Sequence, residues 1–507
     1  MNSKTRTRMI ALTLFAALVL PLQLAAQSTA KQHHQHQYHH YQVIAPGTLG
    51  GPGNALIAPF FPRTGVLNNQ GTLVGWALTS APDPYCGNGP PCDANDAFQL
   101  QDGVTTDLGR LPGGFNSQSQ WISENGLIVG GGDNGQPDPL PPFPLPQLHG
   151  ILWAHGGMTD LGTLPEGGYF SSPLGVNNRG EVVGFAQNAV PDPNSFGFPG
   201  YGTQTRAFYW KNGVMQDLGT LGTGTDAAAA LINQRGQVVG WSYTNSTPSA
   251  ICAGAGFGYG FSLTTSSFLW DQKNGMRDIG GLGGSCTIAT DLNNRGQIVG
   301  LSALPGDLVM HPFVWDAATG MTDLLGASSG LTNPFFALTI NELGVVAGSA
   351  VDSAFNFYPF VWRKVGNKWK QTDLGVSSVP TSINASGQVV GYGSISFLWE
   401  DGGPAVDLST LMPPNTSLIE VNQINDRGEI VTQGTDANGN HSAFLLIPCD
   451  EKHPGVEGCD YSLVEASDVA SRPSPAVSGA AGRNMPQSLI RQTNRYRIPG
   501  FGGSPRN

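Results

Sequence analysis

A short pattern of apolar and polar positions recurs eight times along the chain. It has the form apolar–Asn–x–x–Gly–x–apolar–apolar–Gly, as in VNNRGEVVG at 176–184. The consecutive internal glycines lie between 41 residues (Gly387 to Gly428) and 60 residues (Gly236 to Gly296) apart. Such self-similarity predicts a repeat protein. The copies occupy 67–75, 122–130, 176–184, 232–240, 292–300, 340–348, 383–391 and 424–432, of which 122–130 and 424–432 are variants.

Each copy predicts a tight turn between two strands. The Asn side chain can hydrogen-bond the backbone of its own turn, and the internal glycine can adopt the positive φ that closes a short hairpin. The predicted turn residues are Asn68, Asn177, Asn233, Asn293, Asn341, Asn384 and Asn425, with Gly71, Gly126, Gly180, Gly236, Gly296, Gly344, Gly387 and Gly428.

Four short strands, named A to D, fit each unit. Strand A ends at the Asn, strand B is the apolar run after the turn, strand C is Phe-x-Trp, and strand D ends in Asp-Leu-Gly. In 207–221 (AFYWKNGVMQDLGTL), the pair Asn212-Gly213 predicts a tight C–D hairpin. Connections this short exclude parallel crossovers, so each unit is predicted to be an antiparallel meander.

Strands B and C are apolar on both faces. Phe208 and Trp210 point to one side of strand C and Tyr209 to the other, while Val238 and Val239 oppose each other on strand B. A sheet with one face in water would alternate with polar residues. Units of this length, covered on both sides, predict an all-β propeller of eight four-stranded blades.

The two ends of the repeat region predict ring closure. The last unit has strands A to C but no strand D, because Pro448 and Cys449 follow strand C directly. The segment 41–51 (YQVIAPGTLGG) has the strand-D pattern without a preceding A, B or C. We therefore expect this N-terminal strand to complete the eighth blade, which removes free sheet edges. The propeller is predicted to span 41–448.

The remaining segments are predicted from composition. Residues 1–26 have the basic start, apolar stretch and small residues of a Sec-type signal peptide, which predicts a secreted or periplasmic protein. The apolar stretch is too short to span a membrane. Residues 27–40 are expected to be a His-rich spacer, and 449–507 an Arg-, Pro- and Ser-rich disordered tail that begins with a cysteine clip.

The charge balance limits the partners. Only 12% of residues are charged and the formal net charge is −11. Nucleic acid or an anionic membrane surface would require a basic face, so neither partner is expected.

Six cysteines in an exported protein predict disulfides, although six cysteines allow fifteen pairings. Proximity along the chain favours Cys86 with Cys92 and Cys449 with Cys459, which leaves Cys252 with Cys286. The spacing of a zinc site is not present in the sequence.

The repeated phrases Asp-Leu-Gly-Thr-Leu, Ile-Asn-x-x-Gly-Gln-Val-Val-Gly and Ala-Phe-x-Trp resemble those of the HAF family of bacterial extracellular repeat proteins. The resemblance covers roughly 41–448. Unit 2 departs from it, with Ser123 in place of Asn and Ile151-Leu152-Trp153 in place of Phe-x-Trp. The resemblance implies an exported bacterial protein and no particular reaction.

The recurrent aromatic and acidic residues have structural interpretations. Because the tryptophans recur at one strand-C position, core packing is favoured over a carbohydrate platform. The strand-D aspartates recur once per unit, which favours turn or inter-strand hydrogen bonds over catalysis. These residues are Trp153, Trp210, Trp270, Trp315, Trp362 and Trp399, and Asp107, Asp160, Asp217, Asp278, Asp323, Asp373 and Asp407.

The predicted inner strands hold few reactive groups. Asp291 is the one carboxylate found in the segments before the turn asparagines, so no catalytic site, cofactor or metal is predicted. The tract 33–41 could bind metal through histidines, but a polar spacer is favoured.

Long B–C loops are expected at 81–96, 132–147, 187–205 and 243–265, with short ones in units 7 and 8. All B–C loops of a propeller lie on one face, and function often resides on such loops. The leading hypothesis is a scaffold that binds a protein or glycan on this face, and drift in tolerated insertions is the bland alternative. A polysaccharide-active hydrolase or lyase is the rival hypothesis.

Overall fold

The computed structural model describes residues 36–56, 65–85, 92–140, 145–196, 202–255, 261–326, 329–333, 338–354, 356–400, 402–414, 417–436 and 439–466. These residues belong to one compact unit that begins at His36.

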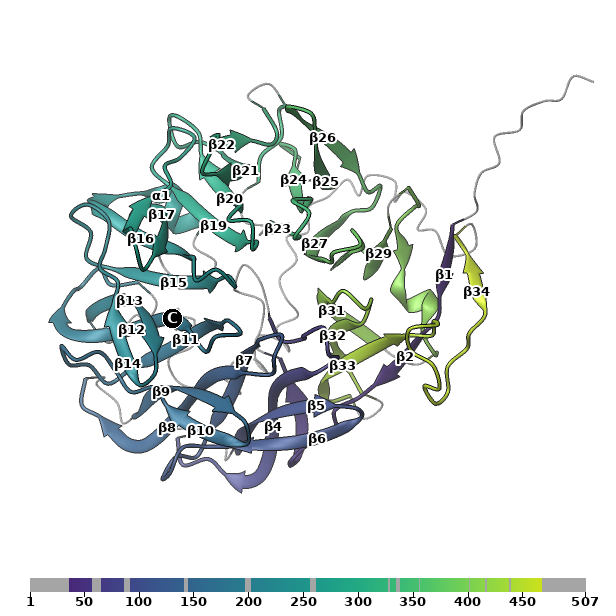
Figure 1. Ribbon diagram of the computed structural model, residues 1–507, viewed down its shortest axis with the longest axis horizontal. Helices are drawn as coiled ribbons and strands as arrows, with labels where there is room; N and C mark the ends of the chain where they lie inside the picture. The colour runs from purple at the N-terminus through teal and green to yellow at the C-terminus, as the bar shows by residue number, and fades with distance from the viewer. Residues whose placement is uncertain are drawn as a thin grey trace, which may run out of the picture. The chain divides into compact units, whose positions relative to one another are not determined.

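The described residues form an eight-bladed β-propeller of four-stranded antiparallel blades, as predicted (Figure 1). The first four blades in chain order are β3 (Gly50–Ala55), β4 (Leu73–Pro82), β5 (Asp93–Gln101) and β6 (Val104–Gly109); β7 (Ser117–Ile122), β8 (Ile128–Asp138), β9 (Leu145–Ala154) and β10 (Gly157–Asp160); β11 (Ser171–Val176), β12 (Val182–Pro191), β13 (Thr203–Lys211) and β14 (Val214–Asp217); and β15 (Ala227–Ile232), β16 (Val238–Pro248), β17 (Leu263–Asp271) and β18 (Gly275–Asp278).

The next three blades are β19 (Thr287–Leu292), β20 (Ile298–Ala303), β21 (Met310–Asp316) and β22 (Gly320–Asp323); β23 (Thr339–Ile340), β24 (Val346–Val351), β25 (Phe357–Val365) and β26 (Lys368–Asp373); and β27 (Ser378–Ile383), β28 (Val389–Gly393), β29 (Phe397–Trp399) and β30 (Val406–Asp407). Two short helices occur between strands, α1 (Ala250–Ala255) and the 3₁₀ helix η1 (Leu408–Leu411).

The eighth blade is assembled from both ends of the described chain, which confirms the predicted closure. It contains β31 (Ser417–Ile424), β32 (Ile430–Thr435), β33 (His441–Pro448) and the N-terminal strand β2 (Tyr41–Ile44). Strand β2 pairs antiparallel with β33, with Tyr41 opposite Pro448 and Ile44 opposite Leu445. In Figure 1 the purple β2 accordingly lies beside the yellow-green β33.

The predicted closing segment 41–51 is longer than the observed strand. Its Gly-Thr-Leu-Gly-Gly part does not extend β2, because β3 starts at Gly50 and pairs with β4 as part of the inner strand of blade 1. The rest of that inner strand lies just before the turn, where Leu67 bridges to Leu73. The first blade therefore has an inner strand in two pieces.

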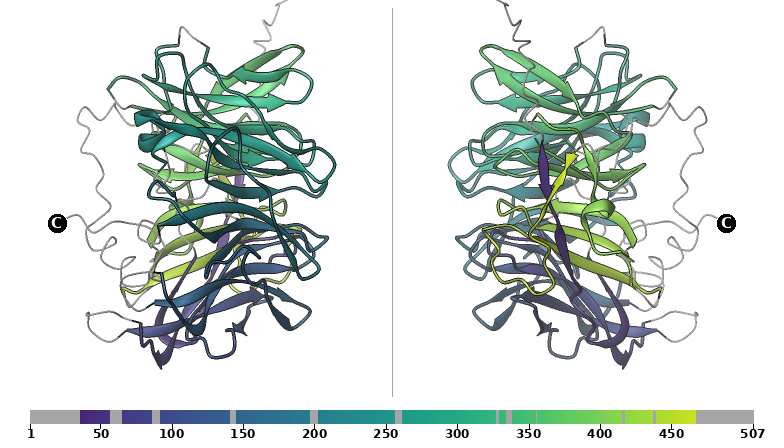
Figure 2. Two further views of the ribbon diagram at one scale, coloured as in Figure 1. Left: turned by 90° about the vertical axis from the view of Figure 1, so that its left-hand side faces the viewer. Right: turned by 90° about the vertical axis from the view of Figure 1, so that its right-hand side faces the viewer.

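Both termini of the described chain contribute one further small sheet, which corrects two predictions. Strand β1 (Gln37–His39) lies in the predicted spacer 27–40 and pairs antiparallel with β34 (Leu463–Glu465), which lies in the predicted disordered tail 449–507. The pair is visible in the right-hand view of Figure 2. The expectation of a tail from Cys449 is thus wrong for 449–466, and 467–507 lie outside the described residues.

The core lies between neighbouring blades, because strands B and C bury both of their faces. Val182, Phe208 and Trp210 pack against blade 2, whereas Val183 and Tyr209 pack against blade 4. This is the alternation predicted from the sequence. The last glycine of the repeated pattern lets strand B approach strand A, since a Cβ on Gly184 would overlap Ser172 O.

Strand B begins at the A–B turn and ends at the B–C connection, so these two connections lie on opposite faces of the ring. We call the face with the A–B turns the turn face and the face with the B–C connections the hairpin face. The A–B turns are 68–71, 123–126, 177–180, 233–236, 293–296, 341–344, 384–387 and 425–428.

Candidate functional site

The turn asparagines close their own turns as predicted. Asn293 Oδ1 accepts hydrogen bonds from the N–H of Arg295 and of Gln297, both at 3.0 Å. The internal glycine of the same turn, Gly296, has a φ of +82°. The turn role of the repeated Asn and Gly positions is therefore visible directly.

The same asparagines also join neighbouring blades, which the sequence did not predict. In seven blades the Asn Nδ2 donates to a backbone carbonyl in the turn of the next blade, at 2.9–3.2 Å. The bonds run from Asn68 to Ser123, Asn177 to Asn233, Asn233 to Asn293, Asn293 to Asn341, Asn341 to Asn384, Asn384 to Asn425 and Asn425 to Asn68.

Blade 2 completes this circuit with a different residue. Ser123, which replaces the Asn there, accepts the N–H of Leu127 but cannot donate to blade 3 in the same way. Instead Asn125, two residues later, donates to Asn178 O at 2.9 Å. All eight turns are thus linked to the next by side-chain amides, including blade 8 to blade 1.

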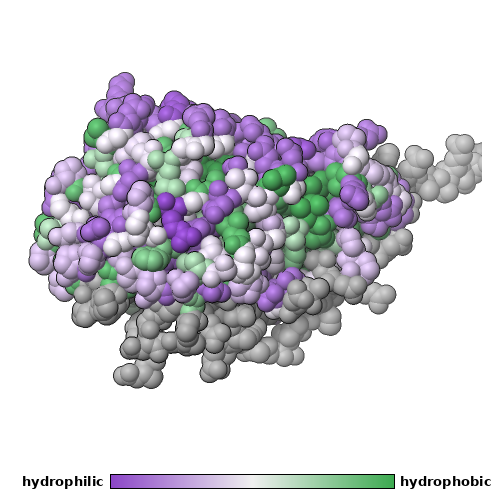
Figure 3. Space-filling view, turned by 90° about the horizontal axis from the view of Figure 1, so that it is seen from below, coloured by the Kyte–Doolittle hydropathy of each residue, from purple (hydrophilic) through white to green (hydrophobic). Residues whose placement is uncertain are grey.

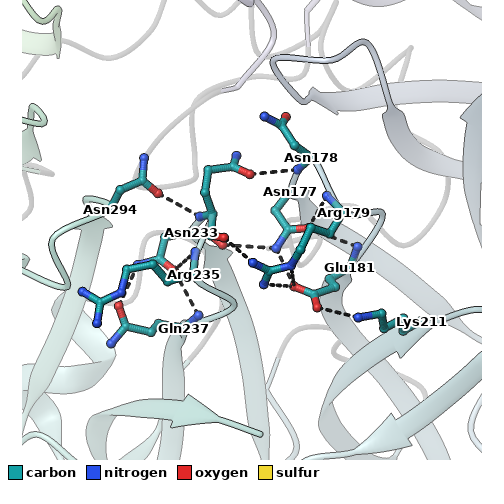
Figure 4. Close-up of polar contacts among 10 residues, drawn as sticks. Asn177, Asn178, Arg179, Glu181, Lys211, Asn233, Arg235, Gln237 and Asn294 are labelled. Carbon is teal, nitrogen blue, oxygen red and sulfur yellow. Dashed lines mark hydrogen bonds and ion pairs between the residues drawn. The ribbon is translucent and has the colours of Figure 1, made fainter.

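A second set of bonds uses the residue after the turn Asn. Its backbone N–H donates to the side chain at the same position in the next blade, as from Asn178 to Gln234 Oε1 and from Gln234 to Asn294 Oδ1. Arginines add further links, since Arg179 reaches Gln234 O and Arg295 reaches Leu343 O. Figure 4 shows these contacts for blades 3 to 5.

Glu181 is the centre of a charged cluster in this network (Figure 4). Its carboxylate pairs with Arg179 and Lys211 and accepts a hydrogen bond from Asn177. Burial opposes ionisation, but the hydrogen bonds from these three side chains outweigh it and lower the pKa of Glu181 to about 2. A carboxylate this strongly neutralised is a poor general acid or base near neutral pH, so the cluster has a structural role.

The strand-D aspartates and strand-C tryptophans have the predicted structural roles. Each Asp accepts the backbone N–H two residues later, as Asp217 does from Gly219 at 2.8 Å. The same Asp217 pairs with Arg206 on the neighbouring strand. Five of the six tryptophans are buried, and Trp315 is partly buried.

The inner strands hold two carboxylates, one of which the sequence analysis missed. Asp291 is fully buried and accepts the N–H of Ile340 in blade 6 at 2.9 Å, so it is another link between blades. The second carboxylate is Glu420 on β31, five residues before the turn residue Asn425. Burial raises the pKa of Glu420 and also that of Tyr392, which the Glu420 charge raises further.

The hairpin face differs between the two halves of the ring. Part of each expected long loop in blades 1 to 4 belongs to strand B or C in the described residues, so the predicted loop bounds are too wide. Strands β4, β8, β12 and β16 have 10, 11, 10 and 11 residues, whereas β20, β24, β28 and β32 have 6, 6, 5 and 6. Blades 1 to 4 therefore carry taller hairpins.

Aromatic and aliphatic side chains are exposed on this hairpin face. Tyr85 and Phe115 pack edge to face at a centroid distance of 5.8 Å, and Phe115 is 37% exposed. Val190 and Leu308 are exposed on other B–C connections. The rim of the ring, which is drawn in Figure 3, carries apolar patches separated by hydrophilic residues. The hairpin face is thus the irregular face, and it offers aromatic contact area that the blades do not use.

The disulfide predictions are confirmed where they can be seen. Cys252 pairs with Cys286, which joins the α1 region of blade 4 to the start of blade 5, and Cys449 pairs with Cys459. The predicted partner of Cys92, Cys86, lies outside the described residues.

Among the residues that the structure describes, no three or more His, Cys, Asp or Glu side chains are grouped to hold a metal ion. Residues 33–35 of the histidine tract lie outside this range, and His40 approaches Asp460 at 3.6 Å. None of the described helices has the length and apolar character needed to cross a membrane.

Comparisons with known proteins identify no family. Neither a family model nor a curated protein matches the chain. Similar solved structures include dipeptidyl peptidase 4 of Porphyromonas gingivalis, which is 7% identical over 72% of this chain and 56% of that chain, with a TM-score of 0.37. An ulvan lyase of polysaccharide lyase family PL25 is 9% identical over 81% of this chain and 96% of that chain, with a TM-score of 0.33.

A third similar structure is a puromycin-hydrolysing peptidase of Mycobacterium tuberculosis. It is 11% identical over 72% of this chain, with a TM-score of 0.31, and the chain spans 61% of that peptidase's length. These scores describe a loose similarity of fold and assign no activity to this chain.

Proposed function

We propose that this protein is an exported scaffold that binds a protein or glycan through its hairpin face and that it is not an enzyme. The observation that carries the proposal is the contrast between the two faces. Polar side chains of the turn face are engaged in links between blades, whereas the hairpin face exposes the Tyr85–Phe115 pair beside tall hairpins. Aromatic side chains are typical of binding hot spots.

Export is part of the same proposal. The predicted signal peptide, 1–26, lies outside the described residues, and the resemblance to the HAF family supports an extracellular or periplasmic location. The disulfides Cys252–Cys286 and Cys449–Cys459 are compatible with such an oxidising compartment.

The test is a binding screen of the purified mature chain against envelope polysaccharides, plant polysaccharides and secreted proteins. For a ligand found in this way, Phe115→Ala is expected to weaken binding by about tenfold or more, since exposed aromatic anchors carry much of the binding energy of an interface. Leu343→Ala is the matched control, because Leu343 is 68% exposed on the turn face. A ligand lost in the Leu343 variant but kept in the Phe115 variant would contradict the proposal.

A hydrolase or lyase acting on polysaccharides is the second candidate, and one observation favours it. Glu420 is a partly buried carboxyl group on an inner strand, close to Tyr392, and its pKa is raised by burial. A carboxyl group of raised pKa is a typical general acid. Turnover of any screened polysaccharide by the wild type, abolished in Glu420→Gln with folding unchanged, would establish this candidate and refute the scaffold proposal.

A further inference from the structure

Two buried carboxylates lie against each other where the tall hairpin of blade 3 meets the start of blade 4. Asp192 follows β12 and is 6% exposed, and Asp226 lies directly before β15 and is fully buried. Burial raises the pKa of Asp226 and the adjacent Asp192 carboxylate raises it further, although hydrogen bonds from Thr205, Thr225 and Ser195 oppose the rise. Two adjacent buried carboxylates need a compensating positive charge or a proton.

Two further oxygen atoms at this hairpin are not accounted for by a proton shared between the carboxylates. In the described part of the chain, Gln187 Oε1, Asp192 Oδ2 and Thr203 Oγ1 are buried and have no hydrogen-bond partner. Buried oxygens without a partner indicate a water or an ion that the protein holds. A proton between the two carboxylates would satisfy Asp192 Oδ2 but would leave the other two oxygens unpaired.

These oxygens lie on the same face of the hairpin as the carboxylates. Gln187 is directly opposite Thr205 in the β12–β13 register, and Thr203 precedes Thr205 by two residues, so all three side chains share one face. Thr205 Oγ1 lies 3.0 Å from Ser195 Oγ, and Ser195 Oγ donates to Asp226 Oδ1 at 2.8 Å. The hydroxyl groups of Thr205 and Ser195 thus connect this face to Asp226.

No basic side chain of the described chain forms an ion pair with either carboxylate. The nearby Arg206 is engaged with Asp217, at 2.8 Å, and with Thr225 O, at 3.0 Å. No ion pair within the described chain therefore offsets the charge of the two carboxylates. Ca²⁺ takes six to eight oxygen ligands from carboxylates, amides, hydroxyls and water, which matches this set.

An equivalent position in another blade shows that the hydrogen bond accepted by Asp226 can also be accepted by a neutral amide. The sequence Pro-Asp-Pro occurs at 82–84, 137–139 and 191–193. For the blade 1 hairpin, the residue equivalent to Asp226 is Asn116, which directly precedes β7. Its Oδ1 accepts the N–H of Asn95 at 3.0 Å. Asp226 Oδ1 accepts the N–H of Thr205 in the same manner, at 2.6 Å. A neutral amide can therefore make the structural bond, and the charge at 226 has another use.

We propose that this cluster binds one hard divalent cation, for which Ca²⁺ is the chemical match, and that the cation joins the blade 3 hairpin to blade 4. The ligands come from Asp192, Asp226, Ser195, Thr203, Thr205 and Gln187. The site revises the sequence-based expectation that no metal is bound. With only two carboxylates, the dissociation constant should lie in the range of extracellular calcium modules, about 10⁻⁴–10⁻³ M.

The experiment uses the full mature chain after treatment with EGTA. Calorimetric titration with CaCl₂ should show one binding event per chain, and the unfolding midpoint should rise with added Ca²⁺ but much less with Mg²⁺. Tb³⁺ should bind with the same stoichiometry and luminesce through Tyr243, whose backbone N–H donates to Asp226 O. A chain that takes up neither Ca²⁺ nor Tb³⁺ overturns the proposal.

Matched variants locate the cation. Asp226→Asn copies the side chain present at Asn116 and should fold while losing the Ca²⁺-dependent rise of the midpoint. Asp138→Asn is the control. Asp138 of blade 2 is equivalent to Asp192 of blade 3, but the residue equivalent to Asp226 is there Phe170, which has no carboxylate. The control should keep full Ca²⁺ binding.

Other outcomes exclude the site. If Asp138→Asn abolishes binding and Asp226→Asn does not, the cation lies elsewhere. If Asp226→Asn simply raises stability above pH 7 and Ca²⁺ has no effect on the wild type, the pair shares a proton and holds no cation. Asp192→Asn serves as the second variant should Asp226→Asn fail to fold, and its retention of Ca²⁺ binding would likewise refute the proposal.

Discussion

The two faces of this propeller use the same strands in opposite ways. On the turn face, eight nearly identical turns are joined to one another by side-chain amides, and substitutions such as Ser123 are compensated nearby by Asn125. On the hairpin face, the connections differ in length from blade to blade, and exposed residues such as Phe115 and Leu308 are not repeated. The difference indicates that the turn face holds the ring together, whereas the hairpin face is free to vary for binding.

The largest effect is expected when the ring itself is opened. Deleting Tyr41–Ile44 removes β2 and exposes the edge of β33, whose backbone groups would then lack partners. We expect aggregation or loss of cooperative unfolding, measured by size-exclusion chromatography and thermal melting followed by tryptophan fluorescence. A truncation after Ala466 leaves every described element in place and is the control. A silent deletion of β2 would mean that closure contributes little and that the turn-face links suffice.

The next largest effect separates the two roles of a turn asparagine. Asn293 is 1% exposed, and its side chain closes its own turn and donates to Asn341 O in the next blade. Asn293→Ala should lower the free energy of unfolding by about 2–4 kcal/mol, because it leaves several buried backbone groups unpaired. Asn293→Ser copies Ser123, keeps a turn acceptor and loses the link between blades, so about half of that loss is expected.

The control for Asn293 lies on the hairpin face. Asn245 Oδ1 accepts the N–H of Thr247 at 2.8 Å within one hairpin and makes no bond to another blade in the described chain. Asn245→Ala should cost less than about 1 kcal/mol in urea unfolding. Equal losses for Asn293→Ala and Asn245→Ala would refute the distinction between the two faces.

The sequence was sufficient to predict the blades but not the contacts between them. Successive apolar residues such as Val182 and Val183 point to opposite faces of a strand, so both faces are predicted to be buried. This pattern is local and can be recognised in the sequence. The hydrogen bond from Asn293 to Asn341 joins residues that are 48 apart in the sequence. An Asn at position 293 would be expected even if its side chain closed only its own turn. The sequence pattern therefore could not distinguish the two uses.

The proposed cation site could not be predicted either, because it too depends on contacts between blades. Asp192 and Asp226 belong to different blades and share no motif, so only the fold brings their carboxylates together. Glu420, by contrast, was within reach of the sequence pattern, because it lies five residues before the turn residue Asn425 on the same inner strand. The ends of strands B and C that were expected to be loops in blades 1 to 4 extend beyond the packed core. They therefore lack the apolar residues from which a strand is predicted.

A smaller, pH-dependent effect is expected where the segment after blade 8 meets the turn face. His453 is buried between Asp450, at 2.6 Å, and Glu429 of the last turn, at 3.3 Å, and Glu429 also pairs with Arg427. Burial lowers the pKa of His453, but the hydrogen bonds and charges of Glu429 and Asp450 outweigh this and raise it above its usual value.

The raised pKa fixes the sign of the effect. Because protonated His453 is favoured in the folded state, its stabilisation is fully present below about pH 6.5, the pKa of an unperturbed His, and is lost as the pH rises through the folded-state value. Urea unfolding midpoints of the wild type should therefore fall, relative to those of His453→Gln, as the pH rises above about 6.5. Parallel pH profiles for the two proteins would show that His453 does not anchor this segment.

The smallest effect is expected for exposed residues of the hairpin face. Leu308 is 88% exposed, and Leu308→Ser removes little buried apolar area, so the free energy of unfolding should change by less than about 0.5 kcal/mol. Phe115→Ala should lower stability only slightly more, through the lost contact with Tyr85. Because both residues would then be dispensable for folding, a ligand affinity that depends on Phe115 could be attributed to the surface itself. A loss of several kcal/mol in either variant would place these side chains in the core and remove the contrast between the faces.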